Sequence, residues 1–291
     1  MYFKLKPSDP NPRLKRKIYL RYIYWMVNRI LKTPSSSLFS GKFSNEPLPE
    51  DNDELAIITV AFNNLDVLQF QRRSLKHLKD KNYSHLIADN SNDWEQSKAI
   101  AAFCEQENIS YIRLPKSRRL DAISGSWSHG AALNWLYYHY ILPRKPKYFG
   151  FIDHDIYLIR PVEIKNKIGN QRFYAHRGTQ ENNMYWLWPG LMFFETGFLQ
   201  NLPVNFLPCR VDGLYMDTGG SMWCILYSKL DTGKLRFAES QNYTLTELGY
   251  DNDSIVSFMD DCWFHSGSAG YRNDDITKYH TIVADILKAY L

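Results

Sequence analysis

The sequence YFGFIDHDIYL, residues 148–158, decides the fold and carries the main candidate site. Its first half is a continuous apolar run, which is typical of a strand covered on both faces. Asp153 and Asp155 follow one residue apart. Ligands of open α/β sheets bind just beyond the carboxyl ends of such strands, so both carboxylates are predicted to face a site.

Two carboxylates this close repel each other unless a cation neutralises them. The pair therefore favours a divalent metal bound by Asp153 and Asp155. The alternative is that one Asp caps the following turn while the other is solvated, because Asp is a common turn residue.

Apolar strands alternate with amphipathic helices before this stretch. The strands are predicted at 55–62, 85–89, 109–114 and 148–153, with helices starting at Asn64 or Asp66, near 95 and near 131. Strands that alternate with helices imply right-handed crossovers and an α/β fold, with a mainly parallel central sheet flanked by helices. The pattern is less regular after Pro161, where strands are predicted at 173–176 and 191–194 and helices at 217–229 and 276–290.

The positive charge of the chain is concentrated at its N-terminus. Residues 1–42 contain ten Lys or Arg and a single Asp, whereas the whole chain has a net charge of +4. The remainder is therefore acidic, which argues against a nucleic-acid-binding core and against a nucleic-acid partner. We predict a basic, aromatic, helical extension and linker at 1–52 and a separate domain at 53–291.

The apolar part of this extension, residues 18–31, is too short and too charged to span a membrane. It also lacks the cleavage site of a signal peptide. A helix in the headgroup region of an anionic membrane and a helix packed on the domain both fit its pattern. The first predicts peripheral contact through residues 1–42 with the inner membrane face. Four widely spaced cysteines favour a reducing, cytoplasmic compartment.

Three motifs, taken in order, resemble the nucleotide-sugar-binding half of GT-A glycosyltransferases, most closely the family 2 type. They are IITVAFNN at 57–64, LIADNSND at 86–93 and the Asp-x-Asp at 153–155. The resemblance covers about residues 55–160 well and 161–270 loosely. It implies a GT-A (Rossmann-like) fold, with a nucleotide-sugar-binding half at 53–160 and an acceptor half at 161–291.

The resemblance implies a donor site at the ends of the first strands. Thr59, Phe62 and Asn63 would lie at the nucleotide, the first two against its base. Asp89 would accept a hydrogen bond from an imide N–H, although its DNSND sequence is equally typical of a local turn. The residues that would approach the nucleotide from below are Ser126, His129, Gly130 and Asn134, although His129 fits a helix surface equally well.

The resemblance also implies a metal, Mn²⁺ or Mg²⁺, that neutralises the departing nucleoside diphosphate. Asp155 would ligate it directly, while Asp153 would hold the ribose or a metal-bound water. His265 would be a further ligand and would favour Mn²⁺. A structural role for this histidine beside aromatic residues is the alternative.

On the acceptor side, Asp217 resembles the general base that removes the proton of the attacking hydroxyl, placed at the start of a helix. A simple helix cap is the alternative, and Asp212 is the reserve candidate. Trp186, Trp188 and Gly190 resemble an acceptor loop whose indole faces pack on a sugar, and a place in the core is the alternative for either Trp. Met216-Asp217 replaces the usual Glu-Asp pair, and no Gln-x-x-Arg-Trp follows, which argues against a processive polysaccharide synthase.

The sequence therefore predicts a metal-dependent glycosyltransferase that moves one sugar from a UDP-sugar to a glycan or lipid-linked acceptor, with inversion. A retaining enzyme on the same fold remains an alternative. So does a catalytically silent nucleotide- or glycan-binding module of a glycan-assembly complex. A nucleotidyltransferase is disfavoured, because the chain has no Gly- and Lys-rich phosphate loop.

Overall fold

The computed structural model describes residues 54–114, 124–179, 183–267 and 276–290. The extension predicted at 1–52, with its membrane-contacting helix, lies outside these ranges. Among the helices within them, none has both the length and the apolar character needed to cross a membrane.

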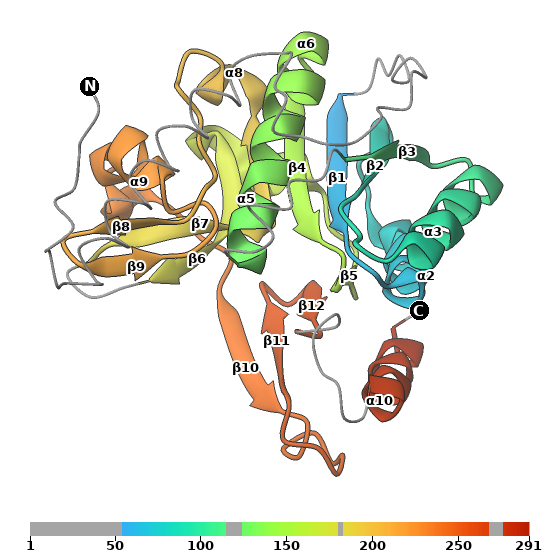
Figure 1. Cartoon of the computed structure of the whole chain (residues 1–291). Coiled ribbons are helices and arrows are strands. Elements are labelled where there is room, and N and C mark those ends of the chain that lie inside the picture. The colour runs from blue at the N-terminus through green and yellow to red at the C-terminus, as the bar shows by residue number, and fades with distance from the viewer. Residues whose placement is uncertain (1–53, 115–123, 180–182, 268–275, 291) are drawn as a thin grey trace, which may run out of the picture. The chain divides into compact units, whose positions relative to one another are not determined.

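A six-stranded mixed sheet forms the centre of the described chain, in the order β3-β2-β1-β4-β7-β6 (Figure 1). Its strands are β1 (Leu55–Ala61), β2 (Tyr83–Asp89), β3 (Ser110–Arg113), β4 (Tyr148–Asp153), β6 (Phe173–Thr179) and β7 (Tyr185–Glu195). The first four are parallel, while β7 is antiparallel to both β4 and β6. The predicted α/β fold with a mainly parallel sheet is confirmed.

Helices connect the parallel strands and begin where polar side chains cap them. The helices are α2 (Leu65–Ser74), α3 (Trp94–Gln106), α5 (Gly125–Leu136) and the short α6 (Leu142–Arg144), which a π-helix at Tyr137–Ile141 joins to α5. Asn64 caps α2 by accepting from the Val67 amide, and Asp93 caps α3 by accepting from the amides of Glu95 and Gln96.

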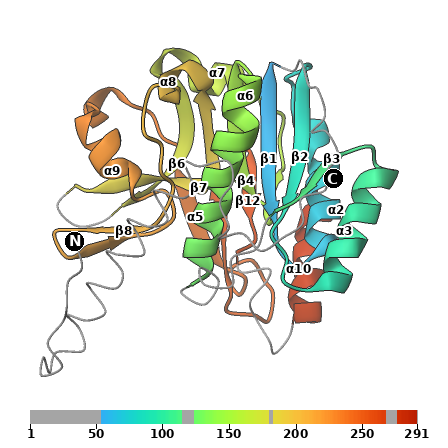
Figure 2. The same cartoon turned by 45° about the horizontal axis from the view of Figure 1, so that its top comes forward.

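The helices cover both faces of the sheet, as Figure 2 shows. Ile58 packs on one face with Leu133 and Leu136 of α5. Ile87 packs on the other face with Ile100 of α3. Alternate side chains of a strand point to opposite faces, so this arrangement explains why β1 is buried at every position and mainly apolar.

A second sheet of short antiparallel strands was not predicted from the sequence. Its order is β10-β11-β12-β5, with β5 (Ile156–Leu158), β10 (Ser240–Thr244), β11 (Ile255–Met259) and β12 (Trp263–His265). Figure 1 shows β10 and β11 extending away from the first sheet. Because β5 follows β4 after only two residues, the chain passes from one sheet to the other at Asp153–Asp155.

The rest of the described chain consists of short elements and one terminal helix. They are α7 (Ile164–Ile168), α8 (Thr196–Leu199), β8 (Cys209–Val211), β9 (Leu214–Met216), α9 (Met222–Ile225) and α10 (Ile276–Lys288), with 3₁₀ turns at Leu75–His77, Gly169–Gln171, Tyr227–Lys229 and Thr232–Lys234. The predicted terminal helix is observed as α10. The helix predicted at 217–229 is wrong in extent, because β9 runs to Met216 and α9 begins only at Met222.

The close approach of β4 and β7 depends on a glycine. Gly150 lies opposite Phe193, and a Cβ at position 150 would lie 2.0 Å from Phe193 Cδ1. Gly150→Ala should therefore lower the free energy of unfolding in urea by about 1–3 kcal/mol, the usual cost of overpacking a core. In a double-mutant cycle, Phe193→Leu should offset part of this loss by vacating the space. An unchanged urea midpoint for Gly150→Ala would contradict this packing.

Candidate functional site

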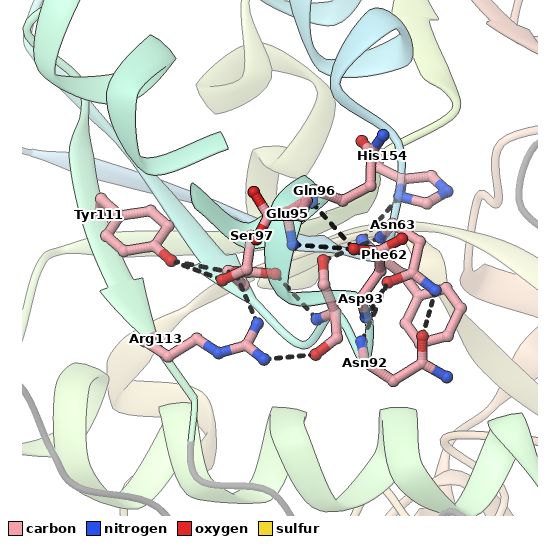
Figure 3. Close-up of polar contacts among 12 residues, drawn as sticks. Phe62, Asn63, Asn92, Asp93, Glu95, Gln96, Ser97, Tyr111, Arg113 and His154 are labelled. Atoms are coloured by element: carbon pink, nitrogen blue, oxygen red, sulfur yellow. Dashed lines mark hydrogen bonds and ion pairs between the residues drawn. The ribbon is translucent and has the colours of Figure 1, made fainter. Parts of the chain in front are cut away.

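Three turns lie side by side where parallel strands β1, β2 and β4 end, at residues 62–64, 90–93 and 153–155. Asn63 joins the first two, as Figure 3 shows. Its amide N–H donates to Ser91 Oγ at 2.8 Å, and its Oδ1 accepts from the amides of Asn92 at 2.9 Å and Asp93 at 3.0 Å. These bonds hold Asn63 at a φ of 51°, in the left-handed region that Asn tolerates. Its side chain is therefore occupied in joining two loops.

The third turn, residues 153–155, is bonded to the first through its middle residue. The Phe62 amide donates to Nδ1 of His154 at 3.1 Å, and Figure 3 draws both residues. As Nδ1 accepts this bond, His154 carries its proton on Nε2. Phe62 itself is half-buried at the end of β1. The turn that bears both candidate carboxylates is therefore attached to the neighbouring strand.

Each carboxylate of this turn faces an imidazole from a different part of the fold. Asp153 Oδ1 lies 3.5 Å from Nε2 of His129 on α5, and Asp155 Oδ2 lies 3.6 Å from Nε2 of His265 at the end of β12. The Asp153 side chain is 24% exposed and that of Asp155 8% exposed. The structure thus brings Asp155 to His265, which were both candidate metal ligands, and also places His129 beside Asp153.

The ionisation of this group reflects burial and the mutual charge of its members. Burial is the main reason that the pKa of Asp153 is raised; His129 opposes this, and the charge of Asp155 adds to it. Burial alone would lower the pKa of His265, but the carboxylates of Asp155 and Asp153 outweigh it and raise that pKa. The site therefore disfavours two uncompensated negative charges, which a bound cation would relieve.

The donor atoms of Asp153, Asp155 and His265 suit Mn²⁺, which accepts both carboxylate oxygen and imidazole nitrogen. Within the described ranges, however, no group of three or more His, Cys, Asp or Glu side chains is arranged to hold a metal. What is present are two carboxylate–imidazole pairs. Such a site resembles those where one or two carboxylates hold a cation together with the phosphates of a substrate.

Trp188 lies beside this group. Its ring centroid is 4.9 Å from that of His265 and 5.8 Å from that of His176 on β6. A Cβ on Gly190 would lie 2.2 Å from the Trp188 ring, so only glycine leaves room for the indole there. Gly190 directly precedes Leu191, the partner of Ile152 on β4. Trp188 and Gly190 are thus brought to the candidate carboxylates.

Trp186 is not part of this group. Its ring lies against Gly178 of β6, where a Cβ would approach within 2.5 Å, and it packs on the main core. His176, in contrast, was missed by the sequence predictions. Its Nδ1 lies 3.0 Å from the carbonyl of Ala238, which can only accept, so this nitrogen donates. A single histidine in an apolar strand gives little signal in a sequence.

Asp217 lies half-buried in the turn between β9 and α9, not at a helix start as predicted. The hydroxyl of Thr218 donates to the carbonyl of Ser126 at 3.0 Å, which ties this turn to the first turn of α5. Gly219 has a φ of 92°, a conformation that favours glycine. Asp212 lies apart, exposed in the two-residue turn of the β8–β9 hairpin.

Two residues predicted to contact the nucleotide are buried, with their polar groups already bonded. Thr59 is fully buried, and its hydroxyl donates to Gln71 Oε1 at 2.7 Å. Asn134 is 1% exposed; it donates to Asn205 Oδ1 at 2.8 Å and accepts from the Phe206 amide at 2.7 Å. The structure does not bring these two side chains to the turn at 153–155. Gly130, on the same helix as Asn134, is also buried, and a Cβ there would lie 2.8 Å from the Phe206 carbonyl oxygen.

Asp89 is fully buried as well, at the end of β2. Its carboxylate accepts from the Ser91 amide at 2.8 Å. It also accepts from three side chains: Ser97 Oγ at 2.5 Å, Tyr111 OH at 3.0 Å and Arg113 Nη1 at 2.6 Å. Figure 3 shows Ser97, Tyr111 and Arg113 converging. Three of these donors bond to Oδ2 and the Ser91 amide bonds to Oδ1, and the side chain is fully buried, so the carboxylate is not exposed to a nucleobase in this conformation.

These donors also determine the charge state of Asp89. Burial alone would raise its pKa, but the hydrogen bonds from Ser91 and Ser97 and the charge of Arg113 outweigh burial and lower it. The structure therefore places an ionised Asp89 where it joins the end of β2 to α3 and β3. The turn-forming alternative for the DNSND sequence agrees with its bond to the Ser91 amide.

Comparisons with known proteins give similar folds but no family. No protein-family model and no curated protein sequence matches the chain. Among solved structures, it is similar to S. aureus TarS at 14% identity and a TM-score of 0.34, over 50% of this chain and 29% of TarS.

The mannosyltransferase PcManGT from Pyrobaculum calidifontis, solved in complex with GDP-Man and Mn²⁺, is 12% identical at a TM-score of 0.32, over 62% of this chain and 53% of PcManGT. The mannosyltransferase Ktr4p from S. cerevisiae is 10% identical at a TM-score of 0.37, over 68% of this chain and 69% of Ktr4p. The chain thus spans about a third of TarS and half of PcManGT. With TM-scores this low, the function has to be inferred from the residues of this chain.

The Asp89–Arg113 pair should contribute to stability. Arg113→Met should lower the free energy of unfolding at pH 7 by about 3 kcal/mol, because it leaves a buried carboxylate with one donor fewer. The pKa of Asp89 is lowered on folding, so its contribution is present above the unfolded pKa and is lost as the pH falls through the folded value. The difference between variant and wild type should therefore shrink in acid, below about pH 4. Urea unfolding at several pH values measures it.

A matched control is Lys98→Met, which breaks an exposed ion pair with Glu95 on α3. We expect no measurable change for this variant, because exposed pairs contribute little. Equal effects of the two substitutions, or a difference for Arg113→Met that does not vary with pH, would contradict the role given to Asp89.

Proposed function

We propose that the chain is a metal-dependent glycosyltransferase that moves one sugar from a UDP-sugar to a glycan or lipid-linked acceptor, with inversion at the anomeric carbon. The observation that carries the proposal is the pair Asp153 and Asp155 at the carboxyl end of β4, each facing an imidazole. This edge of the sheet is where α/β folds bind nucleotides.

In this proposal Asp153, Asp155 and His265 hold Mn²⁺ or Mg²⁺ jointly with the diphosphate of the donor. The cation would neutralise the charge that develops on the leaving diphosphate. The raised pKa of Asp153 and of His265 supports a site that takes up positive charge. Phe62 and Asn63, in the turn after β1, and Ser126, in the first turn of α5, are proposed to contact the nucleotide.

Asp217 is proposed as the general base for the acceptor hydroxyl. Its turn is tied to Ser126 at the start of α5, the helix that also carries His129. Trp188 offers a half-buried indole face next to His265, on which the apolar face of a sugar can pack. The donor would therefore lie over residues 53–160 and the acceptor over 161–291. Residues 1–42 are proposed to contact an anionic, cytoplasmic membrane face.

Calorimetric titration tests the donor site. UDP should bind the wild-type chain more tightly with Mn²⁺ than without it, and GDP and CDP should bind more weakly. Asp155→Asn should weaken Mn²⁺-dependent binding of UDP by tenfold or more, the effect expected when a buried charge-assisted contact of 1.5–3 kcal/mol is lost.

Asp231→Asn is the matched control, because Asp231 is exposed and bonds only local partners in the described structure, the exposed Lys234 and the Gly233 amide. It should bind as the wild type does. If no nucleotide binds under any condition, the donor site is absent. The alternative of a catalytically silent module would then have to rest on glycan binding, without nucleotide binding.

Substitution of the two candidate acids separates their roles. On an acceptor identified with a glycan array, Asp217→Asn should lower kcat by about 10²–10⁴ with little change in the KM for the donor, since general-base catalysis contributes that much. Asp212→Asn should leave kcat unchanged. The reverse pattern would make Asp212 the base. Retention of configuration in the product, followed by NMR, would rule out direct displacement with either acid as the base.

A further inference from the structure

Gln71 on α2 is a fully buried polar side chain with every hydrogen-bonding atom in use. Its Nε2 donates to the carbonyl of Asp153 at 2.7 Å and to the carbonyl of Ile156 at 2.9 Å. Its Oε1 accepts from the Thr59 hydroxyl at 2.7 Å. Since both carbonyls can only accept, the amide orientation is determined: the NH₂ group must face the turn at 153–156.

A second helix residue continues this contact. Ser74 Oγ accepts from the Leu158 amide at 3.0 Å and donates to the Gln71 carbonyl at 2.7 Å. Gln71 and Ser74 are three residues apart and so lie on one face of α2. β5 is the edge of the second sheet as described. Thus α2 bonds the outer side of β5, where a neighbouring strand would otherwise pair.

A hydrogen bond between His85 and Thr59 helps to fix the orientation of Gln71. His85 Nε2 lies 3.0 Å from Thr59 Oγ1, and because Thr59 donates its proton to Gln71, His85 must be the donor here. Burial lowers the pKa of His85 to about 3, so the imidazole is neutral and keeps this tautomer at ordinary pH. His85 therefore donates to Thr59, Thr59 donates to Gln71, and Gln71 donates to the carbonyls of the turn. Bonds in such chains strengthen one another.

We propose that Gln71 is a positioning residue for the candidate metal site, which holds the backbone on both sides of Asp155 and thereby sets the separation of the Asp153 and Asp155 carboxylates. The metal-site part of this inference rests on the proposed function. The hydrogen bonds do not, because they restrain the turn whatever it binds.

The two carbonyls that Gln71 bonds bracket Asp155, one at the end of β4 and one at the start of β5. The Asp155 carbonyl itself accepts from the Ser266 amide at 3.1 Å. The carbonyls of Asp153, Asp155 and Ile156 therefore all accept hydrogen bonds, and the Gln71 side chain donates two of these. No apolar residue could replace Gln71 without leaving two carbonyls unsatisfied.

Hydrogen exchange and binding together test this inference. Gln71→Met keeps the length of the side chain but removes the amide, and Gln69→Met, on the half-buried neighbouring position of the same helix, is the matched control. In Gln71→Met, amides of residues 153–158 should exchange about tenfold faster or more, because two buried carbonyls lose their donor, while peptides from β2 and α3 exchange as in wild type. Gln69→Met should change neither.

Binding of Mn²⁺ alone, followed by the EPR signal of the free ion, and of UDP with Mn²⁺, followed by calorimetry, supplies the functional readout. Both affinities should fall about tenfold in Gln71→Met and remain unchanged in Gln69→Met. Wild-type exchange at 153–158, equally faster exchange throughout the sheet, or unchanged affinities would each overturn the proposal. If the wild type binds neither probe, the proposed function fails, while the exchange data still decide whether Gln71 holds the turn.

Thr59 provides a second pair of variants if Gln71→Met does not fold. Thr59→Val removes the donor that orients the amide and should give a smaller, equally local increase in exchange at 153–158. Thr59→Ser keeps the hydroxyl and should restore wild-type exchange. Equal behaviour of the two Thr59 variants would contradict the directed chain of bonds.

Discussion

The bonds from Gln71 to the carbonyls of Asp153 and Ile156 are the constraint on which the site depends. At this point the chain must leave the mixed central sheet and enter the antiparallel second sheet within two residues. Backbone carbonyls that leave one sheet before joining the next have no strand to pair with, and a buried carbonyl without a donor is costly. A single amide supplies both donors and so lets the turn be short.

A short turn has an electrostatic result. It keeps two carboxylates one residue apart on a rigid backbone, so their repulsion cannot be relieved by movement. The fold compensates with imidazoles from opposite sides, His129 on α5 and His265 on β12. A histidine can give up its proton when a cation arrives, which a lysine or arginine would do far less readily. This choice of partners is compatible with the metal site that we propose.

The first half of the fold could be predicted from the sequence because its signals are local. Continuous apolar strands, Asn64 and Asp93 as helix caps, and the regular β-α-β order needed no knowledge of distant residues. The second sheet has strands of three to five residues, and β5 pairs with β12 about a hundred positions later. Short strands that pair with distant parts of the chain produce no hydrophobic periodicity that a short window of the sequence could show.

The candidate site, like the fold, could be predicted from the sequence only in part. Asp153, Asp155 and His265 were expected at one site and lie near one another, and Trp188, which was expected on the acceptor side, lies beside His265. Thr59 and Asp89 were expected to face a ligand, but strand ends do not reveal which side chains turn inward, and their partners Gln71 and Arg113 come from other elements. Gln71 did leave a signal: with Val67, Leu68 and Ser74 it occupies the buried face of α2, where an unpaired polar side chain would be costly.

The strand β5 has a consequence for attempts to recombine this protein with others. It belongs by sequence to the first half of the chain, yet its strand partner β12 carries His265 and belongs to the second. A chimera whose two parts are joined near residue 160 would therefore separate β5 from its partner β12 and disrupt the second sheet. The replacement half would have to bring a strand that matches β5 in register, or the imidazole beside Asp155 would be lost. The two halves are thus not interchangeable parts, even though Arg160 and Pro161 at the junction between them are exposed.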